Sequence, residues 1–272
     1  MASTYDLAKL ADVKDWLDIS GADDDALLSR LITRLSRGIL NYLDRQSILP
    51  TNFSETFDGG GERSLLLGQW PVNAVLGCAV NGLPIPAAPA IAPDSLRPGF
   101  VLDQGDIAPP GRRQRLSLRG RRFDCGVQNV SVSYWAGYQI ADEAITIPLE
   151  APYSVTALSP YGDWASDGGV ISNGLAMARV AASPAAGQYS VADGVYTFNG
   201  ANAGSAAAVT YGYVPADLAI GCMDWVAERY SYRSRIGQQS KSLGGQETMA
   251  YLVKDIPDFV AAALQPYRRV AL

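Results

Sequence analysis

Apolar residues recur at helical spacing near the start of the chain. Leu28, Ile32, Leu35, Ile39 and Leu43 follow one another at steps of four, three, four and four, so they share one helix face. This pattern predicts a helix over about residues 25–43, preceded by a shorter amphipathic helix in "LADVKDWLDI". Residues 1–47 are therefore expected to be helical.

From residue 53 the hydrophobic period changes from helical to two. The stretches "RQRLSLRG" and "VQNVSVSYWAGY" alternate apolar and polar residues, as a half-buried strand does. Asn81-Gly82 lies between two apolar runs and predicts a type I′ hairpin turn. Residues 84–110 are rich in proline and alanine and predict a long loop.

The segment 139–213 has a composition of its own. It is rich in Ala, Gly, Ser and Tyr, and short alternating runs are separated by Asp-Gly and Asn-Gly turns. This pattern favours a small antiparallel β-sandwich. Its Tyr161 and Trp164 could bind sugar, but closing a small core is the favoured interpretation.

Helical signals return after residue 213. Residues 214–236 predict a helix with Pro215 in its first turn and an apolar stripe. "GQQSKSLGGQET" then interrupts the helix, and "TMAYLV" predicts a short extended piece. A last helix is expected between Asp255 and Pro266.

The last helix has about ten residues, and an isolated helix of that length is marginal in water. It must therefore bury its apolar face against its own domain or against a partner, and the pattern alone does not choose between them. The residues expected on that face are Ile256, Val260, Ala263, Leu264 and Tyr267.

The composition narrows the possible chemistry. The 272 residues carry a net charge of −5, which argues against a general nucleic-acid binder. Histidine is absent, and the three cysteines form no CxxC, so neither a Ser-His-Asp triad nor a zinc site is expected. We expect no cofactor, no signal peptide, no membrane-spanning helix and a reduced, intracellular setting.

One stretch departs from the acidic average. Residues 111–123, "GRRQRLSLRGRRF", hold six of the eighteen arginines and no acid, for a charge of +6. In a strand, Arg113, Arg115 and Arg119 would lie opposite Leu116 and Leu118. That surface is expected to face either solvent or a partner.

Acidic residues gather elsewhere. Residues 1–30 hold seven acidic and three basic residues, and 139–213 hold six and one. The run Asp23, Asp24 and Asp25 sits where helix caps and first-turn carboxylates belong, which is favoured over a cation site. Asp163 and Asp167 could pair as catalytic carboxylates, but their spacing identifies no reaction, so a hydrolase ranks last.

Several stretches together resemble the head–tail adaptor (connector) proteins of tailed bacteriophages and prophages. They are "LADVKDWLDISGADDDALLSRLI", "RSLLLGQWPV", "VSVSYWAGY", "YVPADL", "ERYSYRSRIGQQSKSLGG" and "IPDFVAAALQPYRRV", in family order. The resemblance implies a structural protein and no enzyme. It implies a dodecameric ring beneath the portal protein at the head–tail junction of the virion, assembled in the host cytoplasm. The ring would extend the DNA channel without sequence-specific contacts and would dock the next neck or tail protein.

The resemblance also suggests roles for individual residues. In head–tail adaptor proteins the C-terminal segment typically clasps the portal, which favours a partner for the last helix of this chain. The portal-binding residues expected here are Ile256, Phe259, Val260, Leu264, Tyr267, Arg268 and Arg269. In a ring, opposite charges on two surfaces would align one subunit with its neighbour or with the portal. The residues expected at these subunit interfaces are Arg112, Arg113, Arg115, Arg119, Arg121, Arg122, Asp23, Asp24 and Asp25. The alternative for the arginines is DNA phosphate in the channel.

The chain departs from shorter relatives by about seventy-five residues between "VSVSYWAGY" and "VPADL". We interpret them as an inserted β-domain with adjacent ends, although an extension of one larger sheet stays possible. The expected fold is α+β: a helical core domain with β-hairpin and sheet elaboration over 1–138, an inserted β-sandwich over 139–213, and a core helix with an extended C-terminal arm ending in a short helix over 214–272. A carbohydrate- or receptor-binding virion protein acting through the insert is the alternative function.

Overall fold

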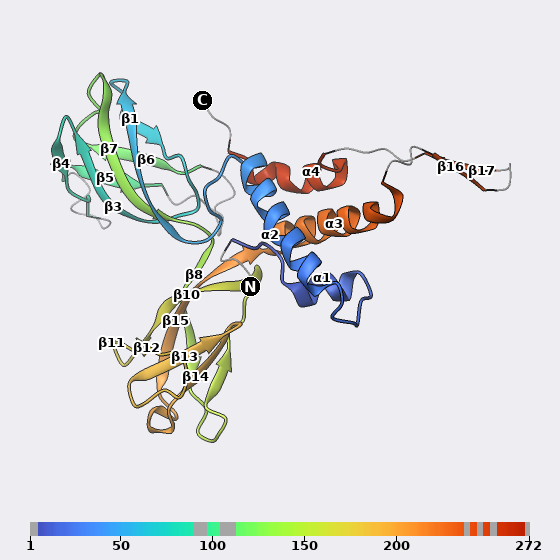
Figure 1. The fold of residues 1–272 in the computed structure, drawn as a ribbon. Coiled ribbons are helices and arrows are strands. Elements are labelled where there is room, and N and C mark those ends of the chain that lie inside the picture. The colour runs from blue at the N-terminus through green and yellow to red at the C-terminus, as the bar shows by residue number, and fades with distance from the viewer. Residues whose placement is uncertain are drawn as a thin grey trace. The chain divides into compact units, whose positions relative to one another are not determined.

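The computed structural model describes residues 5–89, 97–103, 113–236, 240–243, 247–250 and 255–269. The chain forms two compact units (Figure 1). Two separate stretches, up to Gln46 and from Pro215 to the end of the described residues, build a helical unit, and Ser47–Val214 builds a β unit. The mixture of helices and several sheets confirms the expected α+β class.

The helical unit is built around two long helices. They are α2, Asp25–Tyr42, and α3, Ala216–Tyr232, which pack against each other. The short α1, Leu10–Trp16, packs against both, and α4, Asp258–Leu264, packs on α3. The remaining elements are the 3-10 turns η3, Arg233–Arg235, and η4, Gln265–Tyr267, and the hairpin of β16, Ser240–Leu243, with β17, Glu247–Ala250.

The predicted helix over residues 25–43 is confirmed, and its apolar stripe is buried. Leu28, Ile39 and Leu43 are fully covered, as the four-three spacing requires of a core-facing stripe. A buried Ser36 interrupts this stripe, and its hydroxyl accepts a hydrogen bond from the Leu7 amide at 2.9 Å and lies 3.5 Å from Cys222 Sγ. The polar group is thus satisfied, as a buried hydroxyl must be.

The first half of the β unit consists of two small sheets over one core. One sheet has the order β1-β7-β3-β4, with β1 Thr51–Gly59, β7 Gly126–Ala136, β3 Val72–Val80 and β4 Leu83–Ile85. The other has the order β2-β6-β5, with β2 Ser64–Leu66, β6 Arg115–Arg119 and β5 Gly99–Leu102. Their shared core includes Phe53, Leu116, Leu118, Val132 and Tyr134.

The Asn81-Gly82 turn is confirmed between β3 and β4. Both residues have positive φ, 52° and 75°, which a type I′ turn demands. The loop predicted over 84–110 is wrong in part, because β4 ends within it and β5 lies within it. Strands of three and four residues are too short to show a period in the sequence.

The second half of the β unit consists of two four-stranded sheets. One has the order β11-β10-β15-β8, with β11 Leu175–Ala176, β10 Gly162–Ser172, β15 Ala206–Pro215 and β8 Gln139–Thr146. The other has the order β12-β13-β14-β9, with β12 Ala178–Arg179, β13 Gln188–Ala192, β14 Val195–Phe198 and β9 Ser154–Thr156. The turn η2, Gly200–Asn202, leads into β15, and a common core includes Ile147, Val170, Tyr196, Phe198 and Tyr211.

The two ends of this second half meet at one point. The Tyr213 amide donates to the Tyr138 carbonyl at 3.1 Å, and the Tyr138 amide donates to the Ile48 carbonyl at 2.9 Å. Gly137 has a φ of 140°, and a Cβ there would lie 2.4 Å from the Leu49 carbonyl carbon, so only glycine fits. The division of the chain at 138/139 and 213/214 stays a prediction, and this junction is the contact on which it depends.

Candidate interaction surfaces

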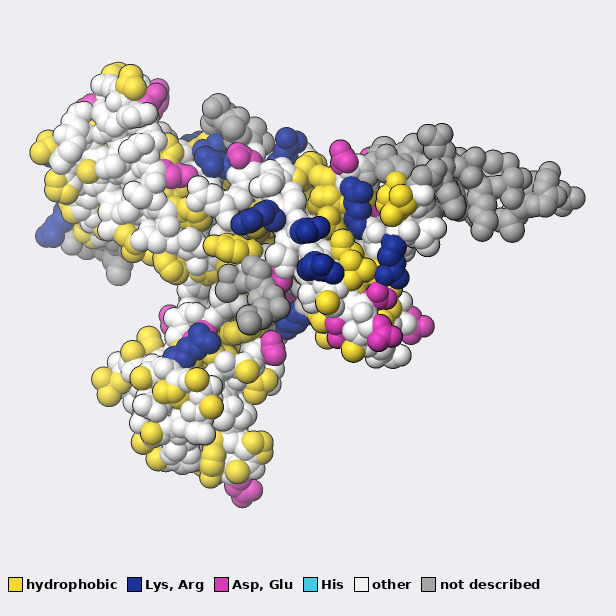
Figure 2. Space-filling model, in the orientation of Figure 1, with side chains coloured by type: hydrophobic (Ala, Val, Ile, Leu, Met, Phe, Trp, Pro, Cys, Tyr) yellow, Lys and Arg dark blue, Asp and Glu magenta, His cyan; other side chains and the backbone are white. Residues whose placement is uncertain are grey.

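Acidic side chains gather at one end of the helical unit. Residues 5–25 contain seven aspartates and two lysines. Asp15, Asp18 and Asp23 are exposed, and none of them has a side-chain partner among the described residues. Figure 2 shows acidic side chains around α1 and the loop that follows it. We call Asp15, Asp18 and Asp23 the acidic end.

The other two aspartates of the run tie helices together within the chain. Asp24 stands at the N-cap of α2 without a capping hydrogen bond. Its carboxylate accepts hydrogen bonds from the Tyr230 hydroxyl and, at 2.9 Å, from Arg233 Nη1, and these bonds lower the pKa of Asp24. Asp25 pairs with Lys14 at 2.7 Å. The expected side-chain cap is therefore wrong for Asp24, because tyrosine and arginine from α3 and η3 compete for its oxygens.

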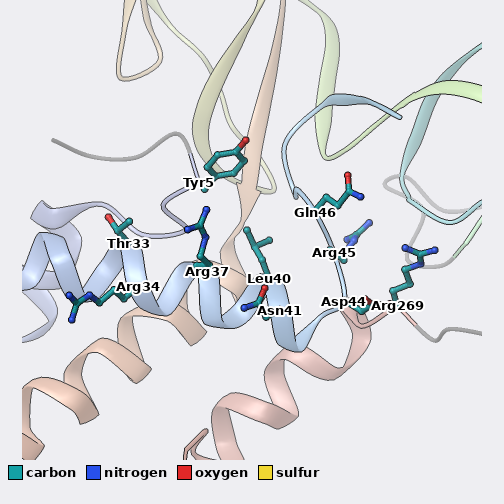
Figure 3. A pocket seen from close by; sticks show the side chains of 10 residues that line it. All are labelled: Tyr5, Thr33, Arg34, Arg37, Leu40, Asn41, Asp44, Arg45, Gln46 and Arg269. Carbon is teal, nitrogen blue, oxygen red and sulfur yellow. The ribbon is translucent and has the colours of Figure 1, made fainter. Parts of the chain in front are cut away.

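A groove lined by arginines follows α2 and the residues after it. Its volume is about 710 Å³. Figure 3 shows Arg34, Arg37 and Asn41 along α2, with Arg45 and Arg269 beyond its C-terminal end. We call it the arginine groove, and it is lined by Tyr5, Thr33, Arg34, Arg37, Leu40, Asn41, Asp44, Arg45, Gln46 and Arg269.

The arginines of the groove differ in how firmly they are held. Arg45 is only 5% exposed, so its charge is built into the wall of the groove. Arg34 and Arg37 are exposed and have no partner among the described residues. With four of its ten lining residues arginine and one aspartate, the groove favours an anionic occupant.

The C-terminal segment lies on its own chain. Val260 and Leu264 are fully buried where α4 packs on α3, whereas Phe259 is 58% exposed and Ile256 is half-buried. The Tyr267 hydroxyl donates to Asp217 at 3.3 Å. Portal binding by this segment stays a prediction, and in this conformation Val260 and Leu264 are not accessible to a partner.

The last two residues of the predicted portal-binding set contact the end of α2. The Arg268 guanidinium lies 5.3 Å from the centre of the Tyr42 ring, a cation–π arrangement. The Arg269 amide donates to the Leu43 carbonyl at 2.8 Å, and the Arg269 side chain lines the arginine groove. The end of the segment thereby connects to the groove.

The arginine-rich stretch turns several of its side chains onto its own unit. Arg113 Nε donates to the Leu67 carbonyl at 2.8 Å, and Arg119 Nη1 donates to the Pro89 carbonyl at 2.8 Å. Arg122 Nη1 donates to the Gly61 carbonyl at 3.2 Å. Arg112 lies outside the described residues.

Two arginines of the stretch are left facing outward. Arg115 and Arg121 are exposed and have no partner among the described residues. The alternation predicted for this strand is confirmed, since Leu116 and Leu118 are buried and Arg115 is exposed. The interface predicted for the six arginines therefore depends most directly on Arg115 and Arg121.

The predicted carboxylate pair of the insert is not arranged as one. Asp163 is exposed, whereas the Asp167 side chain is 4% exposed and accepts the hydroxyl hydrogen bonds of Tyr189 at 2.7 Å and Tyr196 at 3.3 Å. Arg179 Nη1 lies 3.5 Å from Asp167. Burial and the Asp167 charge raise the pKa values of both tyrosines, so the cluster holds the sheets together rather than supplying an acid or base.

The two aromatic residues considered for sugar binding differ in exposure. Trp164 packs against the insert core and donates its Nε1 hydrogen to the Tyr196 hydroxyl at 3.2 Å, which supports the core interpretation. Tyr161 is 48% exposed, with its ring centre 6.0 Å from that of Tyr213. A single exposed ring does not build a sugar platform.

The three cysteines differ in reactivity. Cys78 and Cys222 are buried, which raises the pKa of their thiols to about 11 and about 12. Cys125 is exposed. Within the described part of the chain, no group of three His, Cys, Asp or Glu side chains could hold a metal ion, and no helix is long and apolar enough to span a bilayer.

Comparison with known proteins supports the resemblance seen in the sequence. Residues 7–60 match the sequence model of the family described as phage gp6-like head-tail connector proteins. This match confirms the resemblance to head–tail connectors and the expectation of a structural protein rather than an enzyme. The matched residues comprise α1, α2 and β1, so they include the acidic end and most of the arginine groove.

The other comparisons add little. No curated protein matches the chain. A chain of the structure titled "Neck of empty GTA particle computed with C6 symmetry" is 12% identical, covers 100% of this chain and 94% of its own length, and has a TM-score of 0.39. A TM-score this low does not establish a common fold.

Sequence reasoning missed the arginine groove. Arg30, Arg34 and Arg37 recur at steps of four and three, which places them on one face of α2, away from its leucine stripe. That signal was present in the sequence, but residues 111–123 hold a denser run of arginine. Arg45 and Arg269 join the groove only through the fold, so helical spacing in the sequence could not identify them.

Proposed function

We propose that the chain is a structural component of the neck of a phage-type virion. It would assemble as a ring at the head–tail junction, bind the portal protein, extend the DNA channel and dock the next neck or tail protein. The observation that carries this proposal is the match of residues 7–60 to head-tail connector proteins. A ring of twelve copies is what the family resemblance implies.

The two charged surfaces support ring assembly. A closed ring of identical subunits needs two different, complementary surfaces on each copy. The helical unit offers one acidic and one basic surface, and each holds side chains without partners among the described residues. The net charge of −5 supports a DNA channel that lets the genome slide past without gripping it.

The direct test is to mix the full chain with purified portal protein and image the complex by electron microscopy. A ring of copies stacked on the portal is the expected result. A complex of one or two copies without ring density, or no complex at all, would refute the proposal.

The C-terminal segment is proposed to contact the portal through its uncovered side chains. Phe259 is the large exposed apolar residue of α4, and exposed aromatic residues commonly anchor protein interfaces. Phe259→Ala should weaken portal binding at least about tenfold, whereas Ile220→Ala, at a 48% exposed position of α3, should not. Unchanged affinity of Phe259→Ala would remove α4 from the portal interface.

Residues 139–213 are proposed to be an inserted domain. The hydrogen bond between the Tyr213 amide and the Tyr138 carbonyl supports this, because the ends of a tolerated insertion must lie close together. Replacing 139–212 by a two-glycine linker should leave ring formation and portal binding intact. Loss of the folded state in that variant would favour one continuous sheet structure instead.

Exposed apolar residues of the insert favour a second candidate function, binding to a receptor or glycan. Leu149, Leu158 and Leu175 are each more than 70% exposed. A glycan array with the full-length chain would test this function. Equal signals from the full chain and the variant without 139–212 would exclude it.

A further inference from the structure

The helical unit carries opposite charge at its two ends. Residues 5–25 hold seven aspartates and two lysines, whereas residues 26–46 hold four arginines and one aspartate. Figure 2 shows the acidic group around α1 and dark blue side chains farther along the unit. The division falls near the start of α2, so this helix separates the two charges along its length.

Side chains of both groups are available for a partner. Arg34 and Arg37 on one side, and Asp15 and Asp23 on the other, are exposed and have no partner among the described residues. This distinguishes them from Asp24, Asp25 and Arg233, which already pair within the chain. A single exposed ion pair contributes little to binding, but two complementary sets of charges determine how two partners are oriented.

Within one copy these charges do not pair, since Asp15, Asp23, Arg34 and Arg37 have no partner among the described residues. Asp23 precedes α2 and Arg37 lies fourteen positions further along, roughly 20 Å at 1.5 Å per residue, which an arginine side chain does not span. Both sets of charges are therefore left for contact with another molecule.

We propose that the acidic end of one copy docks in the arginine groove of the next. The docked segment is the end of α1 and the loop before α2, with Asp15 and Asp23 opposite Arg34 and Arg37. Arg45 and Arg269 add positive charge at the far end of the groove. The inference rests on the proposed ring, and it names the contact that joins successive subunits.

Charge complementarity between the acidic end and the groove supports this occupant, and nucleic acid is the alternative that the test separates. A head-to-tail contact uses a different surface on each partner, and its two halves lie on the same unit of this chain. DNA that binds the groove would need the arginines and would be indifferent to the acidic end. The two occupants therefore differ in what the acidic residues do.

Charge reversal of each surface tests the contact. Arg34→Glu/Arg37→Glu makes both surfaces acidic, and Asp15→Lys/Asp23→Lys makes both basic. Each variant alone should self-associate at least about tenfold more weakly than the wild type, because like charges are brought together. An equimolar mixture should assemble again, since each surface then meets its opposite.

Assembly is measured by mass photometry and sedimentation over a range of concentration and salt. The matched control is Glu150→Lys/Asp163→Lys, which changes the net charge as much as Asp15→Lys/Asp23→Lys does, at exposed positions of the β unit. This control should assemble as the wild type does. Wild-type assembly should weaken as added salt screens the contact.

Each other outcome counts against a specific statement. If the wild type forms rings and both reversal variants also form rings alone, the named contact is wrong and the ring stands. If neither the wild type nor the mixture forms a ring even after portal protein is added, the ring and the contact are both overturned. If Arg34→Glu/Arg37→Glu loses binding to a DNA duplex while its rings persist, the groove serves nucleic acid instead.

Discussion

Replacing Leu264 by alanine should release α4 from the helical unit without unfolding the rest. Leu264 is fully buried and lies against Gly221 of α3, and Val260 is the other fully buried residue of α4. Truncating a buried leucine to alanine costs about 2–5 kcal/mol. A helix of seven residues has no stability of its own in water, so this cost falls on its docking.

Hydrogen exchange with mass spectrometry measures this directly. Amide exchange over 258–267 should speed up by roughly 30-fold or more, since each 1.4 kcal/mol corresponds to a factor of ten. Exchange in α2 should change little, because α2 packs mainly on α3. The midpoint of thermal unfolding should fall by only a few degrees.

The matched control is Phe259→Ala in the same helix. Phe259 is 58% exposed, so its removal should leave the exchange of α4 nearly unchanged. Unaltered protection of 258–267 in Leu264→Ala would refute the docking of α4 on α3. Equal loss of protection in α2 and α4 would show instead that the helical unit unfolds as one.

Three further outcomes follow from the structure. Burial and the hydrogen bond to Glu143 raise the pKa of Tyr211 to about 12. The contribution of the protonated Tyr211 to folding stability is therefore complete below its ordinary pKa near 10 and is lost as pH rises towards 12. The Tyr211→Phe variant should lose less stability than the wild type between pH 9 and 12, and an equal loss in both proteins would contradict this. Gly137→Ala should destabilise the β unit by more than about 2 kcal/mol in urea unfolding, because the added Cβ meets backbone, and a loss below 0.5 kcal/mol would refute the close contact. The hydrogen bond from Tyr230 lowers the pKa of Asp24. The contribution of the ionised Asp24 to folding stability is therefore present above its ordinary pKa near 4 and is lost on acidification. Asp24→Asn should make the folding stability less dependent on acid pH than that of the wild type, and an unchanged pH profile would contradict the pairing.

The main elements could be predicted because their burial leaves a period in the sequence. The stripe from Leu28 to Leu43 identified α2, and the alternation of Leu116 and Leu118 identified β6. The Asn81-Gly82 turn was identified because few residues accept two successive positive φ angles. In each case a local constraint acts on neighbouring residues.

Long-range choices could not be predicted in the same way. The role of Asp24 is decided by Tyr230, which lies 206 positions away. Whether Leu264 packs on its own chain depends on the surface of α3, which no local pattern describes. The hydrogen bonds of Arg113 and Arg119 to carbonyls of their own unit likewise depend on where loops pass.

The candidate surfaces show the same limit. Counting charge pointed to residues 111–123, but charge alone does not tell which guanidinium groups are already used by the fold. The helical spacing of Arg34 and Arg37 was visible, yet their significance appears only beside Arg45 and Arg269 in one groove. Density of a residue type is thus a weaker guide than its availability.

The contrast among the three thiols gives the native protein a built-in labelling site. Cys125 stands in solvent on the β unit, while burial keeps Cys78 and Cys222 protonated at neutral pH. A maleimide dye should therefore attach at a single position without any engineered cysteine. One fluorophore per subunit would then allow the copies in an assembled particle to be counted by stepwise photobleaching.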